Sequence, residues 1–143
     1  MNEQTAAALA VHAMAVRFEL VLHGEDQSHL RAAGEEALDE ITALEAQLSL
    51  YRAESELSWI NSRAAHEGVK VEPRLFRLLQ MAKTLHVETD DAFDVTIAPL
   101  MHAWGFVGGD GKMPNPKELE AARNVVGMEH VRLDEADFTV RFD

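Results

Sequence analysis

Two positions near the start and middle of the chain carry residue types that can contact a flat ligand. Met14 stands between Ala13 and Ala15, and these small neighbours leave room for a ring to approach the backbone. The alternative, which the residue type alone favours, is an ordinary core methionine. Tyr51 follows the end of a long apolar stripe, where its phenol could stack on a ring or cover a helix end.

A third candidate is the stretch TDDAFDVTIAPLMHAWGF at 89–106. It is too apolar for a simple connection between helices, so it predicts a segment that is buried or that wraps a ligand. Asp94 lies one turn before Pro99. Its carboxylate could cap a short helix or accept hydrogen bonds from ligand hydroxyl or amine groups, and capping is the commoner role of an isolated aspartate.

Motifs of the common enzyme classes do not occur in this sequence. The glycines at 105–111 are followed by a proline segment and Lys112 by Met113, which excludes a dinucleotide fingerprint and a P-loop. There is no serine-hydrolase elbow and no cysteine. The histidines show no paired ligand spacing, so each is expected to be a surface or capping residue; they are His12, His23, His29, His66, His86, His102 and His130.

Composition indicates a single globular domain, with 143 residues of which 47% are hydrophobic. The net charge of -12, from 25 acids and 13 bases, argues against a nucleic-acid partner. A phosphorylated ligand would need helix N-termini, backbone N–H groups or a divalent metal. The N-terminus lacks the features of a signal peptide and no segment reaches membrane-spanning length, so the sequence as written predicts a cytoplasmic chain.

Periodicity predicts the elements that must position these residues. Alternation over 14–22 predicts a half-buried strand, and the next helix is expected to begin with Asp26 or Ser28 as its cap. Its apolar stripe has spacings of three and four; the members are Leu30, Ala33, Ala37, Ile41, Leu44 and Leu48.

The second half predicts a short strand at 69–71 and a helix that starts at Pro73. The expected buried face of that helix is Leu75, Leu78, Leu79, Ala82 and Leu85. A further helix has Asn115 as its cap, Glu118 completing a capping box and Gly127 at its end, and a β-hairpin follows from residue 131. The predicted fold class is therefore α+β.

Four stretches together resemble the ApbE family of FAD:protein FMN transferases, in order and in spacing. They are AMAVRFEL (13–20), LSLYRAESELSWIN (48–61), AFDVTIAPLMHAWGF (92–106) and VGMEHVRLD (126–134). The resemblance runs from about residue 13 to residue 143. The third stretch is the most specific, because its acid, threonine, proline–leucine and tryptophan–glycine–phenylalanine are hard to meet in that register by chance.

The resemblance implies the N-terminal half of a larger ApbE-like, T-fold-like domain over 13–143, with a mixed or antiparallel sheet and an extension at 1–12. It implies transfer of FMN from FAD to a Thr or Ser hydroxyl of an acceptor protein, with release of AMP and with Mg²⁺ present. The residues that match FAD contacts of the family are Met14, Tyr51, Ala92, Phe93 and Asp94. The family's catalytic and metal-binding segments are expected beyond residue 143, in a C-terminal half that would be a further partner of this chain. Family members are often exported.

Two departures from the family pattern leave a second interpretation open. Ala15 and Val16 replace a Gly-Thr pair, and Asp91 replaces a glycine. If the Asp91 position needs positive φ, aspartate is among the better substitutes and local strain is expected. The alternative is a non-catalytic flavin-binding or protein-interaction module derived from the same family.

Overall fold

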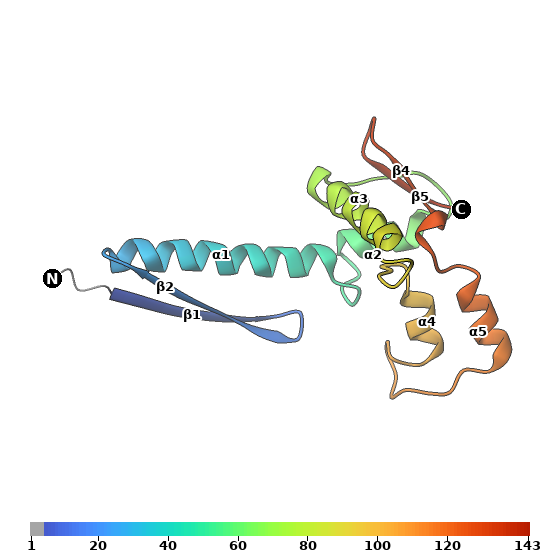
Figure 1. The fold of residues 1–143 in the computed structure, drawn as a ribbon, viewed down its shortest axis with the longest axis horizontal. Coiled ribbons are helices and arrows are strands. Elements are labelled where there is room, and N and C mark those ends of the chain that lie inside the picture. The colour runs from blue at the N-terminus through green and yellow to red at the C-terminus, as the bar shows by residue number, and fades with distance from the viewer. Residues whose placement is uncertain (1–4) are drawn as a thin grey trace. The chain divides into compact units, whose positions relative to one another are not determined.

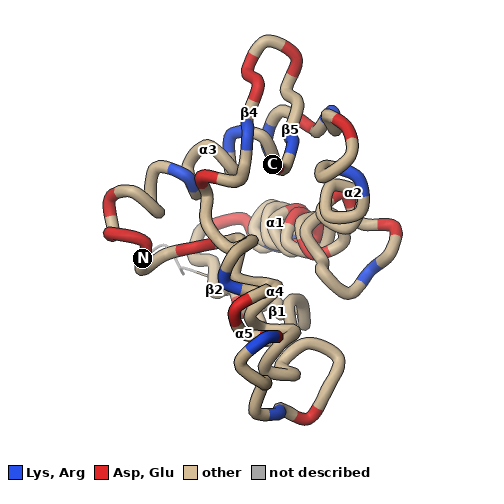
Figure 2. Tube along the Cα trace, turned by 90° about the vertical axis from the view of Figure 1, so that its right-hand side faces the viewer, with Lys and Arg blue, Asp and Glu red and all other residues tan. Residues whose placement is uncertain are grey.

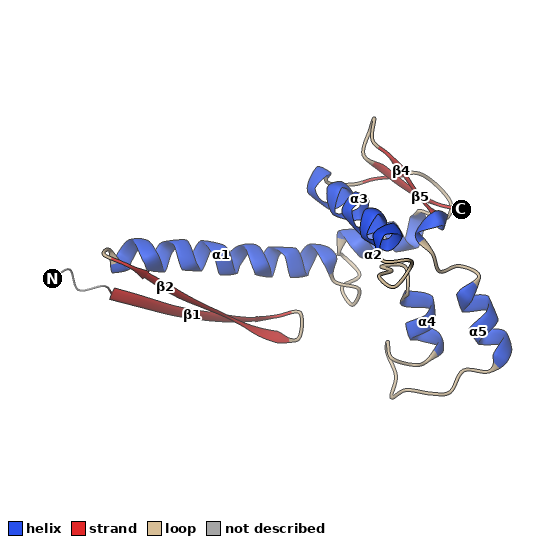
Figure 3. Cartoon of the chain, in the orientation of Figure 1, coloured by secondary structure: helices blue, strands red, loops and turns tan. Residues whose placement is uncertain are grey.

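The computed structural model describes residues 5–143, which form two compact units divided between Asn61 and Ser62 (Figure 1). Helices and strands occur in runs along the chain, as Figure 3 shows, and every strand pairing among the described residues is antiparallel. The α+β prediction is confirmed. Of the two sheet types left open by the sequence, the described residues have the antiparallel one.

The first unit begins with a β-hairpin of β1 (Thr5–Ala13) and β2 (Val16–Gly24), joined by a two-residue turn. The strand predicted over 14–22 therefore starts two residues late, and Met14 lies in the turn. Most of the predicted extension at 1–12 is also a strand, although residues 1–4 lie outside the described part. Alternation fails to place the turn because Met14 and Ala15 are not typical turn residues.

Helix α1 (Gln27–Leu48) lies along the hairpin, and Asp26 caps it by accepting from the backbone N–H groups of Ser28 and His29 (Figure 1). Its buried residues are Gly34 and Leu38, so the predicted stripe is wrong at Ala33 and Ala37, which are exposed, whereas its other four members are half-buried. The reason is close packing. A Cβ on Gly34 would stand 2.7 Å from Leu9 and 3.3 Å from Leu22, atoms of the two strands beneath.

A short helix that the sequence did not predict, α2 (Glu56–Arg63), follows α1. Ser55 precedes it, and its buried hydroxyl accepts from the N–H of Ser58 at 3.0 Å while donating to the carbonyl of Ser49 at 2.6 Å. This serine therefore caps the helix and fixes the loop that leads into it.

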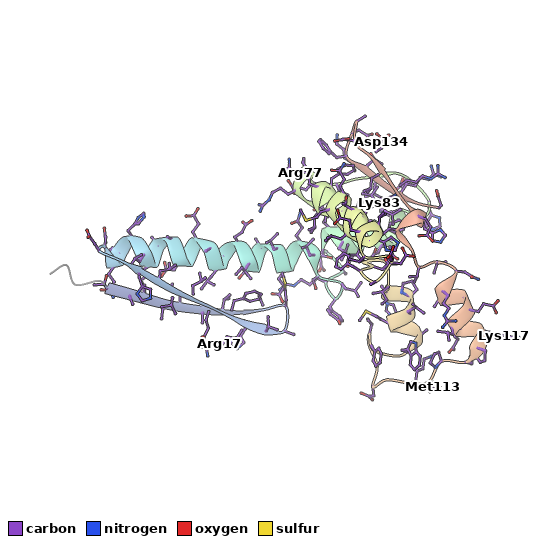
Figure 4. All side chains as sticks on the ribbon, in the orientation of Figure 1. Arg17, Arg77, Lys83, Met113, Lys117 and Asp134 are labelled. Atoms are coloured by element: carbon purple, nitrogen blue, oxygen red, sulfur yellow. The ribbon has the colours of Figure 1, made fainter. Side chains whose placement is uncertain are left out.

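The second unit contains a three-stranded sheet in the order β3 (Val69–Lys70), β5 (Thr139–Phe142), β4 (Val131–Asp134). The predicted C-terminal hairpin is confirmed. Helix α3 (Pro73–Glu88) is tied to this sheet by an edge-to-face contact of Phe76 with Phe138 at 5.4 Å. It is also tied by a 2.8 Å bond from Lys83 Nζ to the carbonyl of Val131 (Lys83 is labelled in Figure 4).

The buried face of α3 differs from the predicted one. Leu78 and Leu85 are exposed, whereas Phe76 and His86 are buried beside Leu75 and Ala82. The stripe is rotated by about one position because the aromatic ring of Phe76 is wholly buried and must face Phe138. This rotation brings a histidine into the interior.

Helices α4 (Ala98–Ala103) and α5 (Pro116–Arg123) lie side by side in the same unit. The predicted capping box of Asn115 with Glu118 is confirmed. Helix α5 ends at Arg123, however, and Gly127 precedes the 3-10 helix η1 (Met128–His130) with φ 134°. The prediction that Gly127 ends the helix is therefore wrong, because its special backbone conformation serves the next turn.

Lys and Arg residues are distributed singly along the trace (Figure 2). Over residues 5–143, none of the helices combines the length and the apolar character needed to cross a bilayer.

Candidate functional site

The stretch at 89–106 begins with the Phe93 loop, residues 89–96, which follows α3. Thr89 ends the helix: its backbone N–H and its hydroxyl both donate to the carbonyl of Leu85, at 3.0 and 2.7 Å. The next two residues are left-handed, with φ 49° at Asp90 and 64° at Asp91. This confirms positive φ at the position where the resembling family usually has glycine, and such a conformation is unfavourable for residues with a Cβ.

The backbone of Phe93 is fixed on both sides of its Cα. Its N–H donates to the Thr89 hydroxyl at 3.0 Å, and its carbonyl accepts from His86 Nδ1 at 3.0 Å. The side chain is nevertheless 42% exposed. The loop therefore fixes the backbone from which the Phe93 ring projects, while the residue stays partly exposed.

Asp94 organises the second half of the loop. Its Oδ1 accepts from the N–H of Thr96 at 2.7 Å and from the Thr96 hydroxyl at 2.6 Å. Helix α4 begins after Ile97 without any side-chain cap, so the prediction that Asp94 caps that helix is wrong. The turn at Thr96 captures this carboxylate before the helix starts. Thr96 in turn accepts from the N–H of Gly127 at 2.7 Å, which joins the loop to the segment before η1.

His86 is the residue of this site that the sequence did not single out. It is 7% exposed, against the expectation of a surface histidine, and both ring nitrogens face the loop. Nε2 lies 3.0 Å from Asp91 Oδ1, and Nδ1 lies 3.8 Å from Asp94 Oδ2 in addition to its bond with Phe93. The available signal was its position four residues after Ala82, on the buried face of α3.

The other two predicted contact residues lie in the first unit. Met14 is 46% exposed, which excludes the core-methionine alternative, and its backbone N–H donates to Glu45 Oε1 of α1 at 2.7 Å. Tyr51 is 77% exposed, with its N–H bonded to the Ser49 hydroxyl at 3.2 Å. The structure thus brings Ala92, Phe93 and Asp94 together on one loop. Met14 lies in the β1–β2 turn of the other unit and Tyr51 in the loop after α1, and each has its backbone N–H hydrogen-bonded.

Groups of three or more His, Cys, Asp or Glu residues suited to a metal ion do not occur within residues 5–143. The donor set of the Phe93 loop agrees with this description, because Asp94 Oδ1 is engaged by Thr96 and Asp91 Oδ1 by His86. The loop carries the partly exposed Phe93 ring and the hydrogen-bonded Asp94 carboxylate.

Comparison with known proteins assigns nearly the whole chain to one protein family. Residues 14–142 match the sequence model of the ApbE family. An FAD:protein FMN transferase of Vibrio cholerae is 35% identical over 91 residues, covering 62% of this chain and 27% of that protein. One from Klebsiella pneumoniae is 32% identical over 115 residues, covering 79% of this chain and 36% of that protein.

Solved structures agree on the fold. The ApbE protein of Thermotoga maritima superposes with a TM-score of 0.87 at 24% identity, covering 96% of this chain and 45% of that one. The flavin transferase ApbE of Vibrio cholerae gives 0.82 at 25% identity, covering 98% of this chain and 46% of that one. The architecture is thus that of ApbE structures.

The chain belongs to the ApbE family. It spans about a third of the length of the curated relatives named above and under half of the solved chains.

Proposed function

We propose that this chain supplies the FAD-binding half of an FAD:protein FMN transferase. The single observation that carries the proposal is the Phe93 loop, which lies within the family match and presents an exposed ring on a backbone bonded at both sides. A preorganised aromatic ring suits one face of an isoalloxazine or adenine system, because little side-chain freedom is lost when the ligand stacks on it.

Asp94 can complement this stacking contact. Its Oδ1 accepts two bonds from Thr96, whereas among residues 5–143 the contact given for Oδ2 is the 3.8 Å approach of His86 Nδ1, so Oδ2 has lone pairs for a ligand N–H or O–H. Met14 and Tyr51 are further proposed contacts, since both side chains are exposed and their backbones are tied. Ala92 contributes a small side chain beside Phe93, which leaves room for the ligand.

The proposed reaction forms a phosphoester bond between a Thr or Ser hydroxyl oxygen of the acceptor protein and the FMN phosphorus of FAD. The pyrophosphate P–O bond breaks, AMP leaves, and the hydroxyl proton passes to a base. Mg²⁺ would supply charge neutralisation at the pyrophosphate. We assign its ligands and the base to the family segments that this 143-residue sequence does not contain.

The test is to incubate the chain with FAD and Mg²⁺ and to measure both binding and covalent transfer to a purified acceptor protein. We expect saturable FAD binding, with no flavin fluorescence on the acceptor in a denaturing gel. Failure to bind FAD would refute the proposal. Transfer by these residues alone would refute the assignment of the base and the metal ligands to other segments.

The second candidate, a non-catalytic flavin-binding or interaction module, is favoured by Ala15 and Val16, which replace the Gly-Thr pair of the family. A version of the chain extended by a family member's catalytic segments separates the two candidates. Transfer by the extended version supports the transferase; binding without transfer supports the module.

A further inference from the structure

We infer that His86 is a positioning residue for flavin binding, acting through the Phe93 loop rather than by touching the ligand. The inference rests on the proposed FAD site. His86 is almost fully buried, and its ring reaches two loop residues that stand two positions apart, Asp91 through Nε2 and Phe93 through Nδ1.

The contact with the Phe93 carbonyl requires a hydrogen on Nδ1 of the His86 ring. A backbone carbonyl can only accept, so Nδ1 must carry the hydrogen that it shares with Phe93. Nε2 faces an Asp91 carboxylate oxygen at 3.0 Å. The hydrogen bond to Phe93 therefore excludes a ring with a bare Nδ1.

The backbone conformation of the loop explains why it needs the contacts of Asp91 and Phe93 with His86. Asp90 and Asp91 both adopt left-handed backbone conformations that residues with a Cβ rarely adopt. Such a conformation persists only where the surroundings enforce it. The Asp91 carboxylate is itself held by His86, so the residue that departs from the family's glycine is tied at its side chain.

Among residues 5–143, the carboxylates within 4.0 Å of the ring nitrogens both belong to the loop. They are Asp91, 3.0 Å from Nε2, and Asp94, 3.8 Å from Nδ1. Removing the imidazole would leave the Phe93 carbonyl without its donor and would release the strained turn. The backbone that carries the Phe93 ring would then lose its fixed position, and the ring would be displaced without any contact between the ligand and His86.

Three substitutions separate the two bonds. His86→Asn keeps an amide donor near the position of Nδ1, His86→Gln keeps one near Nε2, and His86→Leu keeps neither. We expect His86→Leu to raise the FAD dissociation constant about tenfold and to speed amide hydrogen exchange at Phe93. His86→Asn should restore both to within about threefold of the parent chain, and His86→Gln should restore neither. His66→Leu, at an exposed histidine of the same unit, is the matched control and should change neither.

Nitrogen NMR of the His86 ring adds a readout that does not depend on FAD. We expect a protonated Nδ1 in the parent chain; a bare Nδ1 would overturn the inference. It would also be overturned if His86→Leu matched His66→Leu in affinity and in exchange at Phe93. Should His86→Leu fail to fold, His86→Asn against His86→Gln decides the question, and equal affinity and exchange in the two would overturn it.

The proposed function can fail separately. If the parent chain binds no FAD while Phe93 exchange and the ring state behave as expected, His86 still positions the loop and the FAD assignment is refuted. If FAD binds and the substitutions have no selective effect, FAD binding stands and the role of His86 is refuted.

Discussion

Replacing Ala15 by glycine should stabilise the β1–β2 hairpin by about 0.5–1 kcal/mol. Ala15 has φ 60° in the two-residue turn between Ala13 and Val16. A left-handed conformation costs an L-residue about 1–2 kcal/mol relative to glycine. Against this, glycine loses about 0.5–1 kcal/mol more backbone entropy on folding than alanine does. The difference leaves a net gain, and it explains physically why a glycine suits this position.

The assay is urea unfolding followed by circular dichroism, together with amide hydrogen exchange along β1 and β2. Ala15→Gly should raise the unfolding midpoint and slow exchange in both strands. Ala10→Gly is the matched control, because Ala10 is an exposed residue inside β1. There the same change should destabilise the hairpin by about 0.5–1 kcal/mol.

An Ala15→Gly chain that is less stable than the parent, or a change of the same sign in both variants, would refute the reasoning about the turn. The bond from the Met14 N–H to Glu45 would then have to hold the turn against a preference that glycine does not relieve.

Two further substitutions test how the second unit positions its elements. Asn115→Ala should cost about 1 kcal/mol by removing the cap of α5, where the Asn115 side chain accepts from the N–H of Glu118; unfolding by urea should show it, and an unchanged midpoint would contradict the capping role. Gly127→Ala should cost more than about 1 kcal/mol, because φ is 134°, a backbone conformation that residues with a Cβ rarely adopt. The same substitution should speed amide hydrogen exchange in the Phe93 loop, because the Gly127 N–H is bonded to Thr96. Unaltered exchange in the loop would argue against this link.

Local chemistry made much of the fold predictable. The caps at Asp26 and Asn115, the helix start at Pro73 and the C-terminal hairpin follow from short-range hydrogen bonding and alternation, and all are present. The burial of α1 was mispredicted at Ala33 and Ala37 because it depends on contact with another element. Gly34 is buried because the strands pack closely against its missing side chain, which a hydrophobic stripe cannot reveal.

The candidate site likewise combines residues that the sequence could identify with contacts that only the fold shows. The resemblance pointed to Ala92, Phe93 and Asp94, which do share one loop. It did not reveal His86, because the position of His86 four residues after Ala82 indicates burial but not the contacts that the following loop makes with the ring. The role of Asp94 was misread for a related reason: Thr96 offers its carboxylate two donors before α4 begins.

Calorimetric titration of the chain with FAD in the presence of Mg²⁺ tests the central claim most directly, when the parent chain, Phe93→Ala and Leu78→Ala are compared. Leu78 is 45% exposed, close to the 42% of Phe93, and lies on α3 of the same unit. We expect FAD to bind the parent chain and Leu78→Ala alike, and to bind Phe93→Ala about tenfold more weakly, since stacking on an aromatic ring contributes about 1–3 kcal/mol. Absence of binding heat in the parent chain, or equal affinity in Phe93→Ala, would contradict the account.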